Sequence, residues 1–285
     1  MRRQGEVGLA RALSKLGLAS RTGARALISA GRVAVDGAIV RNPDTPVVPE
    51  RVRIAIDGRT RARPAPLTIL LHKPRGVVTT RSDPEGRPTV YDLLDGITAH
   101  VGPVGRLDAA TSGLLLLTND TRLGEWLTNP AHAVPRVYLV TVRGRLTAET
   151  AARLEHGVVD RGERLRASRV TVRKASARET HLVVELTEGR NREIRRLLAA
   201  VGHEVARLRR VQFGGLTLGR LAPGAWRALD AGEIGRAFPG YLEGRSPYQP
   251  RRDRVGLDRH AHLDGLALGD VVHRPGRYHG RRDHG

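Results

Sequence analysis

Four consecutive leucines, Leu114–Leu117, constrain the fold more than any other stretch of this sequence. They lie near the end of the segment VGRLDAATSGLLLLTND, in which a loop of small residues carries one arginine, Arg106, and one aspartate, Asp108. A run this apolar predicts a strand that is buried on both faces. A carboxylate at the start of such a strand loses solvation, which costs free energy unless the charge is paired. Asp108 is therefore a candidate for chemistry, with a loop cap or an ion pair to Arg106 as the structural alternative.

The composition indicates a polyanionic partner. The chain has 285 residues, with 49 basic and 29 acidic side chains, which gives a formal net charge of +20. Nearly all of the positive charge is arginine, whose planar, forked donor suits phosphates and stacks on bases. A GC-rich genome explains the preference for arginine over lysine, but it does not explain the surplus over acids. We therefore expect nucleic acid as the partner.

The absence of cysteine excludes disulfides and thiolate metal sites, and it favours a reducing compartment. No apolar run approaches the length of a transmembrane helix, and the N-terminus lacks the apolar segment of a signal peptide. We expect a cytoplasmic protein that has no membrane partner and is a monomer.

Residues 1–58 are expected to form a small basic α+β module. Leucines at helical spacing predict a first helix that ends at Gly17, and Ser20 is a plausible N-cap for a second helix, Arg21–Ala30. On that second helix, Ala26, Leu27 and Ala30 can face inward. The dipeptide Asp36–Gly37 predicts a hairpin, and a further strand follows at Arg51–Ile56. The module's candidate RNA-binding side chains are Arg11, Lys15, Arg21, Arg25 and Arg32.

We expect a linker at residues 59–66, a larger body at 67–240 and a basic, disordered or peripheral tail at 241–285. The body mixes hairpins with helices instead of alternating them regularly, so the fold class is α+β with a mixed, largely antiparallel sheet, flanking helices and a central cleft. The expected strands are Leu67–His72, Val77–Thr80, Leu114–Thr118, Val137–Val142, Val170–Val172 and Leu182–Leu186. The expected helices are Arg122–Thr128, Ala148–Glu155 and Arg192–Val201.

A second basic cluster lies in EGRNREIRRLLAAVGHEVARLRRV, residues 188–211. We read it as a turn followed by an amphipathic helix that Asn191 caps and Gly202 ends. Arginines crowd the start of this helix, where the helix dipole attracts anions, so some of them are expected to face phosphates and one can face an internal carboxylate. A solvated basic face suits Arg192 and Arg196 better than Arg195, which borders the apolar stripe.

Tyr138 is the third candidate. It lies in the expected strand RVYLVTV, and the period of two places it on one face with Val140 and Val142. A core tyrosine is the ordinary interpretation. The alternative is a ring placed to stack on a base, with its hydroxyl within reach of Arg106.

Four segments in order, HKPRGVVTT, GRLDAATSGLLLLTND, AVPRVYLVTVRG and EGRNREIRRLLAAVGHEVARLRRVQFGGL, resemble the RsuA/RluB family of ribosomal RNA pseudouridine synthases. The segment LARALSKLGLASRTGARALISAGRVAVDGAIVRNPDTPV resembles the S4 RNA-binding module that precedes their catalytic domain. Together the two resemblances cover about residues 8–235. The departures from the family pattern are Gly23, His72 and Arg136, where glutamate, asparagine and lysine are usual.

The resemblance implies a role for individual residues. Asp108 matches the catalytic aspartate, and Arg106 the neighbouring arginine that helps displace the target uridine from its stack. Tyr138 matches the tyrosine that packs on the uracil ring. Arg195 matches the basic residue that pairs with the aspartate, and Leu208 the apolar residue near the base. We add three further RNA-binding candidates from the same segments: Lys73, Arg192 and Arg196.

The implied reaction cuts the N1–C1′ glycosidic bond of uridine, rotates the uracil and rejoins it through C5. It requires neither cofactor nor metal, and it needs a carboxylate nucleophile at C6 of the base or at C1′ of the sugar, between which the sequence does not choose. We expect ribosomal RNA or an assembly intermediate as the partner, with 23S RNA of the large subunit favoured over 16S RNA. The alternatives are a non-catalytic RNA-binding or ribosome-assembly protein and, on charge alone, a DNA-binding regulator.

Overall fold

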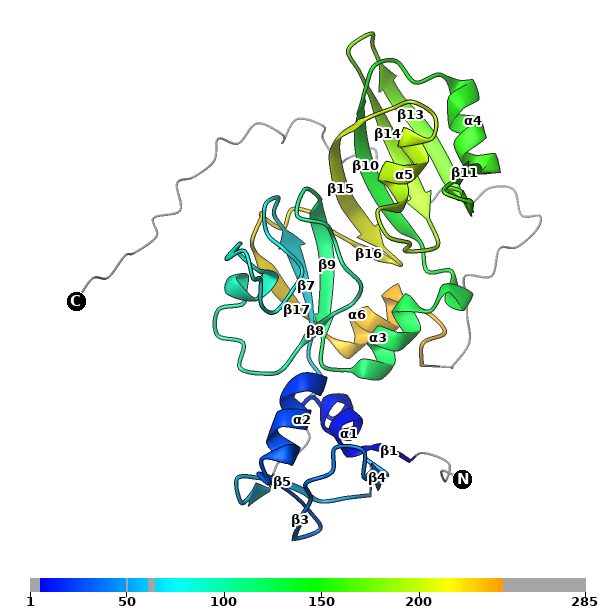
Figure 1. Cartoon of the computed structure of the whole chain (residues 1–285). Coiled ribbons are helices and arrows are strands. Elements are labelled where there is room, and N and C mark those ends of the chain that lie inside the picture. Colours follow the sequence, from blue (N-terminus) through cyan, green and yellow to red (C-terminus); the bar gives the residue numbers. More distant parts are fainter. Residues whose placement is uncertain (1–5, 50, 61–64, 243–285) are drawn as a thin grey trace. The chain divides into compact units, whose positions relative to one another are not determined.

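The computed structural model describes residues 6–49, 51–60 and 65–242. Figure 1 shows a small N-terminal module and a larger body built on one sheet. Almost all of the tail expected at 241–285 lies outside the described residues. Within the described ranges, none of the helices combines the length and apolarity needed to cross a membrane.

The N-terminal module contains two short helices and two small sheets. Its elements are β1 (Val7–Gly8), α1 (Leu9–Lys15), α2 (Arg21–Ser29), β2 (Val33–Val35), β3 (Ala38–Ile39), β4 (Pro46–Val47), β5 (Ile54–Ile56) and β6 (Arg59–Thr60). One sheet has the order β3-β2-β5-β6, and β1 pairs with β4. Strand β6 falls in the segment expected to be a linker.

Local signals explain the module well. The Ser20 hydroxyl accepts a hydrogen bond of 2.9 Å from the Gly23 amide, so it caps α2 as predicted. Asp36 and Gly37 have φ angles of 50° and 90°, which is the conformation that a two-residue hairpin requires. The inward face of α2 was predicted only in part. Leu27 packs against the module's core, but Ala26 and Ala30 are exposed, and the fully buried residues are Ala24 and Ile28, one turn apart.

The body is built on a nine-stranded sheet whose main order is β13-β14-β10-β15-β9-β7-β17, with β16 paired to β15 and β8 to β9. The strands are β7 (Thr68–Lys73), β8 (Gly102–Pro103), β9 (Ser112–Thr118), β10 (Arg136–Arg143), β13 (Arg169–Ala175), β14 (Glu179–Leu186), β15 (Val205–Phe213), β16 (Leu216–Thr217) and β17 (Trp226–Leu229). Every pair is antiparallel except β15–β9. The largely antiparallel α+β fold is confirmed.

Helices and a small hairpin cover the sheet. They are η1 (Val90–Leu93), α3 (Thr121–Thr128), η2 (Pro130–His132), α4 (Ala148–His156), the hairpin β11 (Val158–Asp160) and β12 (Glu163–Leu165), α5 (Glu193–Ala199) and α6 (Ala231–Ala237). Helices α4 and α5 lie over the half of the sheet made by β13, β14, β10 and β15, and α3 and α6 lie near β9 (Figure 1).

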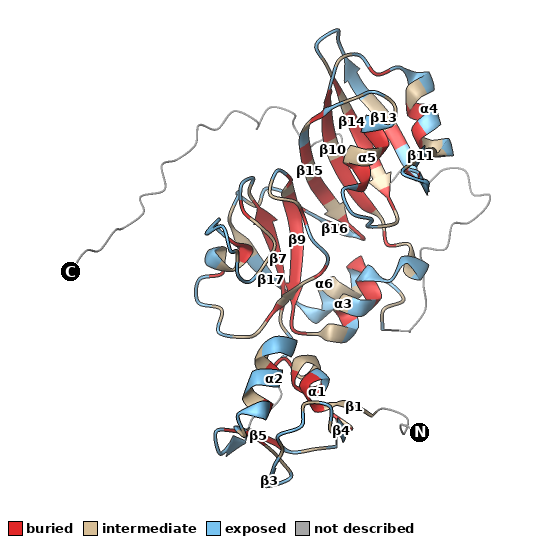
Figure 2. Cartoon of the chain, in the orientation of Figure 1, coloured by how far each residue is buried: buried red, intermediate tan, exposed pale blue. Residues whose placement is uncertain are grey.

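The leucine strand is buried on both faces, as predicted. All four leucines have no exposed surface. Leu115 and Leu117 belong to one apolar cluster, which includes α4 and α5, while Leu114 and Leu116 belong to another, which includes α3 and α6. Figure 2 shows β7, β9 and most of β10 as buried. Strand β9 therefore separates two cores.

Two predictions about local structure were wrong. Residues 77–80 form no strand, because within this segment the structure has only an isolated bridge between Val78 and Thr89. The helix expected from residue 192 is α5, which begins at Glu193, and its N-cap is Arg192 in a left-handed conformation (φ 50°, ψ 31°) instead of Asn191.

The two halves of the sheet meet at the parallel pair β15–β9, which has only two register partners, Arg209 with Ser112 and Arg210 with Gly113. Gly113 has a φ angle of 113°, and a Cβ atom there would lie 2.1 Å from the Arg210 carbonyl oxygen. Only glycine allows the two backbones to approach this closely.

We predict that Gly113→Ala lowers the free energy of unfolding by about 3–5 kcal/mol, because β15 and β9 must separate to admit the methyl group. Gly144→Ala is the matched control, since Gly144 has a φ angle of 76° and open space around the added Cβ. The control should lose only about 1–2 kcal/mol, the cost of the left-handed conformation. Urea denaturation measures both, and equal losses would contradict the close-approach argument.

Candidate nucleic-acid cleft

A cleft of about 570 Å³ opens beside the join between the two halves of the sheet. It is lined by the loop that precedes β9, by β10 and β15, and by the segment that leads into α5. Its volume lies within the range of small-ligand sites. Six arginines and three carboxylates line it: Arg106, Arg136, Arg190, Arg192, Arg195 and Arg210, with Asp108, Glu188 and Glu193. The cleft therefore favours an anionic ligand.

Asp108 lies in the loop between β8 and β9 and lines this cleft. Its side chain is 35% exposed, and its Oδ2 lies 3.3 Å from Nη1 of Arg192. The Thr111 amide donates to the Asp108 carbonyl at 2.9 Å, which closes the loop into a tight turn. The carboxylate is thus accessible from the cleft and paired with a cation, as a nucleophile that must stay ionised requires.

Arg195 lines the same cleft but does not make the ion pair that was predicted for it. Its Nη1 donates to the Val205 carbonyl at 3.1 Å, and its Nε is buried without a hydrogen-bond partner among the described residues. Burial and the charge of Arg192 lower the pKa of Arg195, and the charge of Asp108 opposes this shift. Arg192 makes the ion pair with Asp108 in place of Arg195 because of where each residue lies. Arg195 lies within α5 against β15, whereas Arg192 precedes the helix.

Three contacts from the segment 73–79 hold the loop that carries Asp108. The Lys73 ammonium donates to the Thr111 carbonyl at 2.8 Å, and the Gly76 amide donates to the Ala109 carbonyl at 2.8 Å. The Thr79 hydroxyl donates to the Leu107 carbonyl at 2.8 Å and accepts from the Leu107 amide at 3.3 Å. Thr79 therefore fixes the residue between Arg106 and Asp108.

Lys73 is not a phosphate ligand, contrary to the sequence prediction. Its side chain has no exposed surface, and its ammonium also donates to the Pro74 carbonyl at 2.9 Å. Burial lowers the pKa of Lys73 to about 8, although the charge of Asp108 opposes this shift. The lysine supports the loop from within.

Tyr138 and Leu208 form the apolar wall of the cleft. Tyr138 is 8% exposed and Leu208 is 7% exposed, and both belong to the larger apolar cluster together with Val140 and Leu107. Tyr138 is both a core residue and a cleft residue, so its two sequence interpretations are compatible. Arg106 lines the cleft as an exposed side chain.

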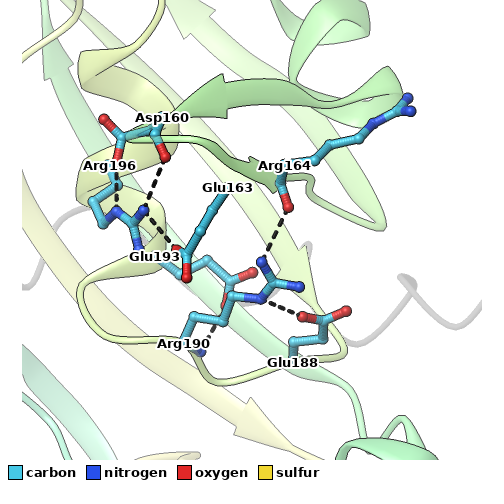
Figure 3. A network of polar contacts seen from close by, with 7 residues as sticks. All are labelled: Asp160, Glu163, Arg164, Glu188, Arg190, Glu193 and Arg196. Atoms are coloured by element: carbon cyan, nitrogen blue, oxygen red, sulfur yellow. Dashed lines mark hydrogen bonds and ion pairs between the residues drawn. The ribbon is translucent and has the colours of Figure 1, made fainter.

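Arg196 has intramolecular partners instead of the RNA contact expected for it. Its Nε donates to Asp160 Oδ2 at 2.6 Å, and its Nη2 lies 2.7 Å from Glu163 Oε2. Figure 3 shows these contacts together with Arg190, which donates to the Glu188 carboxylate and to the Arg164 carbonyl. This network joins the β11–β12 hairpin to the start of α5.

Sequence reasoning gave no site role to two buried arginines of the cleft, Arg136 and Arg210. They are 7% and 3% exposed, and their guanidinium carbons lie 5.0 and 5.1 Å from the centre of the Phe213 ring. The period of two in β10 already places Arg136 on the same face as Tyr138, so the sequence held a signal for the first of them.

Among the described residues, no group of three or more histidine, cysteine or acidic side chains could hold a metal ion. The residues that line the cleft include the three carboxylates named above but no histidine.

Comparison with known proteins identifies both parts of the chain. The family model for RNA pseudouridylate synthase matches residues 67–200, and the S4 domain model matches residues 7–52. An uncharacterized RNA pseudouridine synthase of Aquifex aeolicus is 37% identical over 234 residues, which are 82% of this chain and 94% of the relative. The chain belongs to the RNA pseudouridylate synthase family, whose members isomerise uridine in RNA.

Two relatives carry a more specific name, ribosomal large subunit pseudouridine synthase B. The Bacillus subtilis protein is 35% identical over 80% of this chain and 94% of its own length. The Shigella flexneri protein is 39% identical over 78% of this chain and 79% of its own length. A crystal structure of a pseudouridylate synthase matches with a TM-score of 0.57 and 26% identity, covering 81% of this chain and 99% of that chain.

We predict that Lys73→Met destabilises the protein by about 1–3 kcal/mol at pH 7, because two buried carbonyls lose their donor. Native Lys73 has a pKa of about 8 against an ordinary value of 10.5. Between these values the unfolded chain binds more protons than the folded one, so the free energy of unfolding of the native protein rises with pH. The difference in free energy of unfolding between native protein and variant, measured by urea denaturation, should therefore widen from pH 8 to 10.5. A difference that stays constant over this range would contradict the lowered pKa of Lys73.

We predict that Thr79→Val lowers kcat about tenfold and leaves KM for RNA within twofold, because the loop of Asp108 loses one anchor outside the binding surface. Thr79→Ser keeps the hydroxyl and should recover most of kcat. Thr80→Val is the matched control, since the Thr80 hydroxyl donates to the Ser82 carbonyl in an exposed turn. Single-turnover kinetics with substrate RNA measure the effect, and equal loss in the valine and serine variants would exclude a positioning role of the hydroxyl.

Proposed function

We propose that this protein converts a uridine of large-subunit ribosomal RNA, 23S RNA, to pseudouridine, with Asp108 as the nucleophile. The observation that carries the proposal is the Asp108 carboxylate in the cleft, partly exposed and 3.3 Å from the Arg192 guanidinium, with Tyr138 and Leu208 lining the same cleft. Membership of the RNA pseudouridylate synthase family supports the reaction. The names of the Bacillus subtilis and Shigella flexneri relatives support the substrate.

The chemistry needs an ionised carboxylate in a place that excludes bulk water. Arg192 lies 3.3 Å from the Asp108 carboxylate and supplies the opposite charge beside it. The carboxylate attacks C6 of the base or C1′ of the ribose, and the N1–C1′ bond breaks. The uracil turns and C5 bonds to C1′, the bond to the carboxylate breaks so that Asp108 is regenerated, and the proton lost from C5 is balanced by one taken up at N1. The apolar wall of Tyr138 and Leu208 retains the free uracil while it turns.

The target base must leave its stack to reach Asp108. In our proposal Tyr138 packs on the flipped uracil, and the exposed Arg106 takes the position that the base vacates in the RNA. Both residues lie at the cleft, so one movement of the nucleotide brings its base to Tyr138 and its glycosidic bond to Asp108.

The N-terminal module supplies affinity for RNA in this proposal. Arg11, Arg21, Arg25 and Arg32 are exposed, but Arg25 pairs with Asp44 at 2.9 Å and Arg32 with Asp57 at 2.7 Å. Exposed pairs of this kind are weak and give way readily to a phosphate. The described ion pairs also include Arg11 but neither Lys15 nor Arg21, so Lys15 and Arg21 are the first residues that we assign to phosphate contacts.

We predict that Asp108→Asn lowers pseudouridine formation by at least about 10³-fold, because an amide cannot act as the nucleophile, while Kd for RNA changes less than threefold. Mapping pseudouridines in ribosomal RNA with and without the gene identifies the site, and complementation with the variant tests the residue. Asp95→Asn, an exposed carboxylate outside the cleft, is the control and should be fully active. Turnover by Asp108→Asn would refute the mechanism, and an unchanged pseudouridine map would favour a non-catalytic RNA-binding protein.

A further inference from the structure

The cleft contains two buried cations that have no carboxylate partner among the described ion pairs, Arg136 and Arg210. Both guanidinium groups lie on the ring of Phe213, which contributes a cation–π attraction to each. A buried charge is costly unless an opposite charge compensates it. The two arginines therefore leave uncompensated positive charge in the wall of the cleft.

Their hydrogen bonds differ in a way that singles out Arg210. Arg136 donates to four carbonyls, those of Leu127, Val134, Thr187 and Glu188, at 3.1–3.2 Å. Arg210 donates through Nε to the Leu114 carbonyl at 2.7 Å, but its buried Nη2 has no hydrogen-bond partner within the part of the chain that the structure describes. Arg136 is satisfied by the protein, whereas Arg210 retains a free donor in a residue that lines the cleft.

The buried acidic side chain in the cleft wall does not supply the missing charge. Glu193 is 4% exposed, and its Oε2 accepts from the Arg190 amide at 3.0 Å. Burial raises the pKa of Glu193, so its environment disfavours the ionised form. Burial also lowers the pKa of Arg136, and the charge of Arg210 adds to this shift. The lowered pKa of Arg136 has the direction expected where positive charge lacks a counter-ion, whereas the raised pKa of Glu193 comes from burial and is opposed by the charges of Arg190 and Arg136.

We propose that the Arg210 end of the cleft is a phosphate subsite, which binds a phosphodiester of the RNA strand next to the target nucleotide. This inference rests on the proposed function, because it takes RNA as the ligand. A phosphate oxygen accepts from the free Nη2, and its charge compensates the two guanidinium groups. A carbonyl of the base would satisfy the donor but would leave the charge uncompensated.

The position of Arg210 fits the proposed path of the nucleotide. Arg210 and Tyr138 are register partners on β15 and β10, and cross-strand partners lie about 4.5–5.5 Å apart at their Cα atoms. A nucleotide whose base packs on Tyr138 therefore brings one of its own phosphates to the neighbouring strand. The subsite would hold the nucleotide by its backbone while the glycosidic bond is cut and the uracil turns.

The test compares Arg210→Gln with Arg209→Gln, the same change of charge on the next residue of β15. Arg209 does not line the cleft, and its side chain extends from the other face of the strand. The probe is an RNA oligonucleotide that carries the mapped uridine. We expect Arg210→Gln to raise Kd about tenfold or more and to reduce the slope of log Kd against log salt by about 0.7–0.9, whereas Arg209→Gln binds as the native protein does.

Neutralising single phosphates identifies the partner. The probe is prepared with an uncharged methylphosphonate on the 5′ or the 3′ side of the target uridine. One of the two should weaken binding of the native protein about tenfold and have no further effect on Arg210→Gln, since both changes remove the same interaction. If the methylphosphonates weaken native protein and variant equally, or if Arg210→Gln binds within twofold of Arg209→Gln, the subsite is wrong.

Arg210→Lys provides a second variant if Arg210→Gln does not fold, because it keeps the charge and loses the forked donor. Arg210→Lys should retain the salt slope of the native protein and part of its affinity. The methylphosphonate that weakens binding of the native protein should still raise the Kd of Arg210→Lys more than twofold. Thermal unfolding checks that each variant is folded. Failure of the proposed function would appear as no pseudouridine in RNA treated with native protein, whereas failure of the subsite would leave native activity intact and Kd unchanged in the variants.

Discussion

The parallel contact between β15 and β9 is the constraint on which the rest of the body depends. It has only two register partners, and Gly113 must lack a side chain for the strands to meet. The strand of four leucines continues from this glycine into both cores, while the loop that precedes it carries Asp108. On its other side β15 pairs with β10, which places Arg210 beside Tyr138. One close backbone approach therefore positions the floor of the cleft and the carboxylate that we propose as the nucleophile.

The distribution of charge in the cleft separates structural cations from those that can meet RNA. Arg196 and Arg190 pair with carboxylates, Arg192 pairs with Asp108, and the Lys73 ammonium is hydrogen-bonded to two carbonyls. A largely buried pair such as that of Arg196, which is 18% exposed, contributes mainly to shape, because removing its partner would leave an uncompensated charge. The positive potential that attracts a polyanion comes from the remaining arginines, which an analysis of net charge alone cannot distinguish from the others.

The sequence predicted those elements whose local signals agree with their tertiary surroundings. The capped helix after Ser20, the Asp36–Gly37 hairpin and the leucine strand formed as expected. Strand β15 was missed because three arginines within nine residues, VARLRRVQF, obscure its apolar alternation. In the fold these arginines have different environments, since Arg210 is buried and Arg207 is exposed. Arg210 is held in its buried position by the Phe213 ring and by the Leu114 carbonyl. Leu114 is distant in sequence, so the local pattern does not reveal this contact.

The choice of the cation for Asp108 shows why the candidate site was only partly predictable. Sequence could place several arginines near the carboxylate, because four occur within residues 190–196. It could not choose among them, since the local pattern does not reveal that Arg192 adopts a left-handed φ of 50° immediately before α5. A non-glycine residue in this region stores strain of about 1–3 kcal/mol, which the surrounding structure must hold. The Glu193 carboxylate does so by accepting from the Arg190 amide, while the Arg190 carbonyl accepts from the Glu193 amide. Glu193, a buried residue that lines the cleft, thereby supports the turn from which the Arg192 guanidinium reaches Asp108.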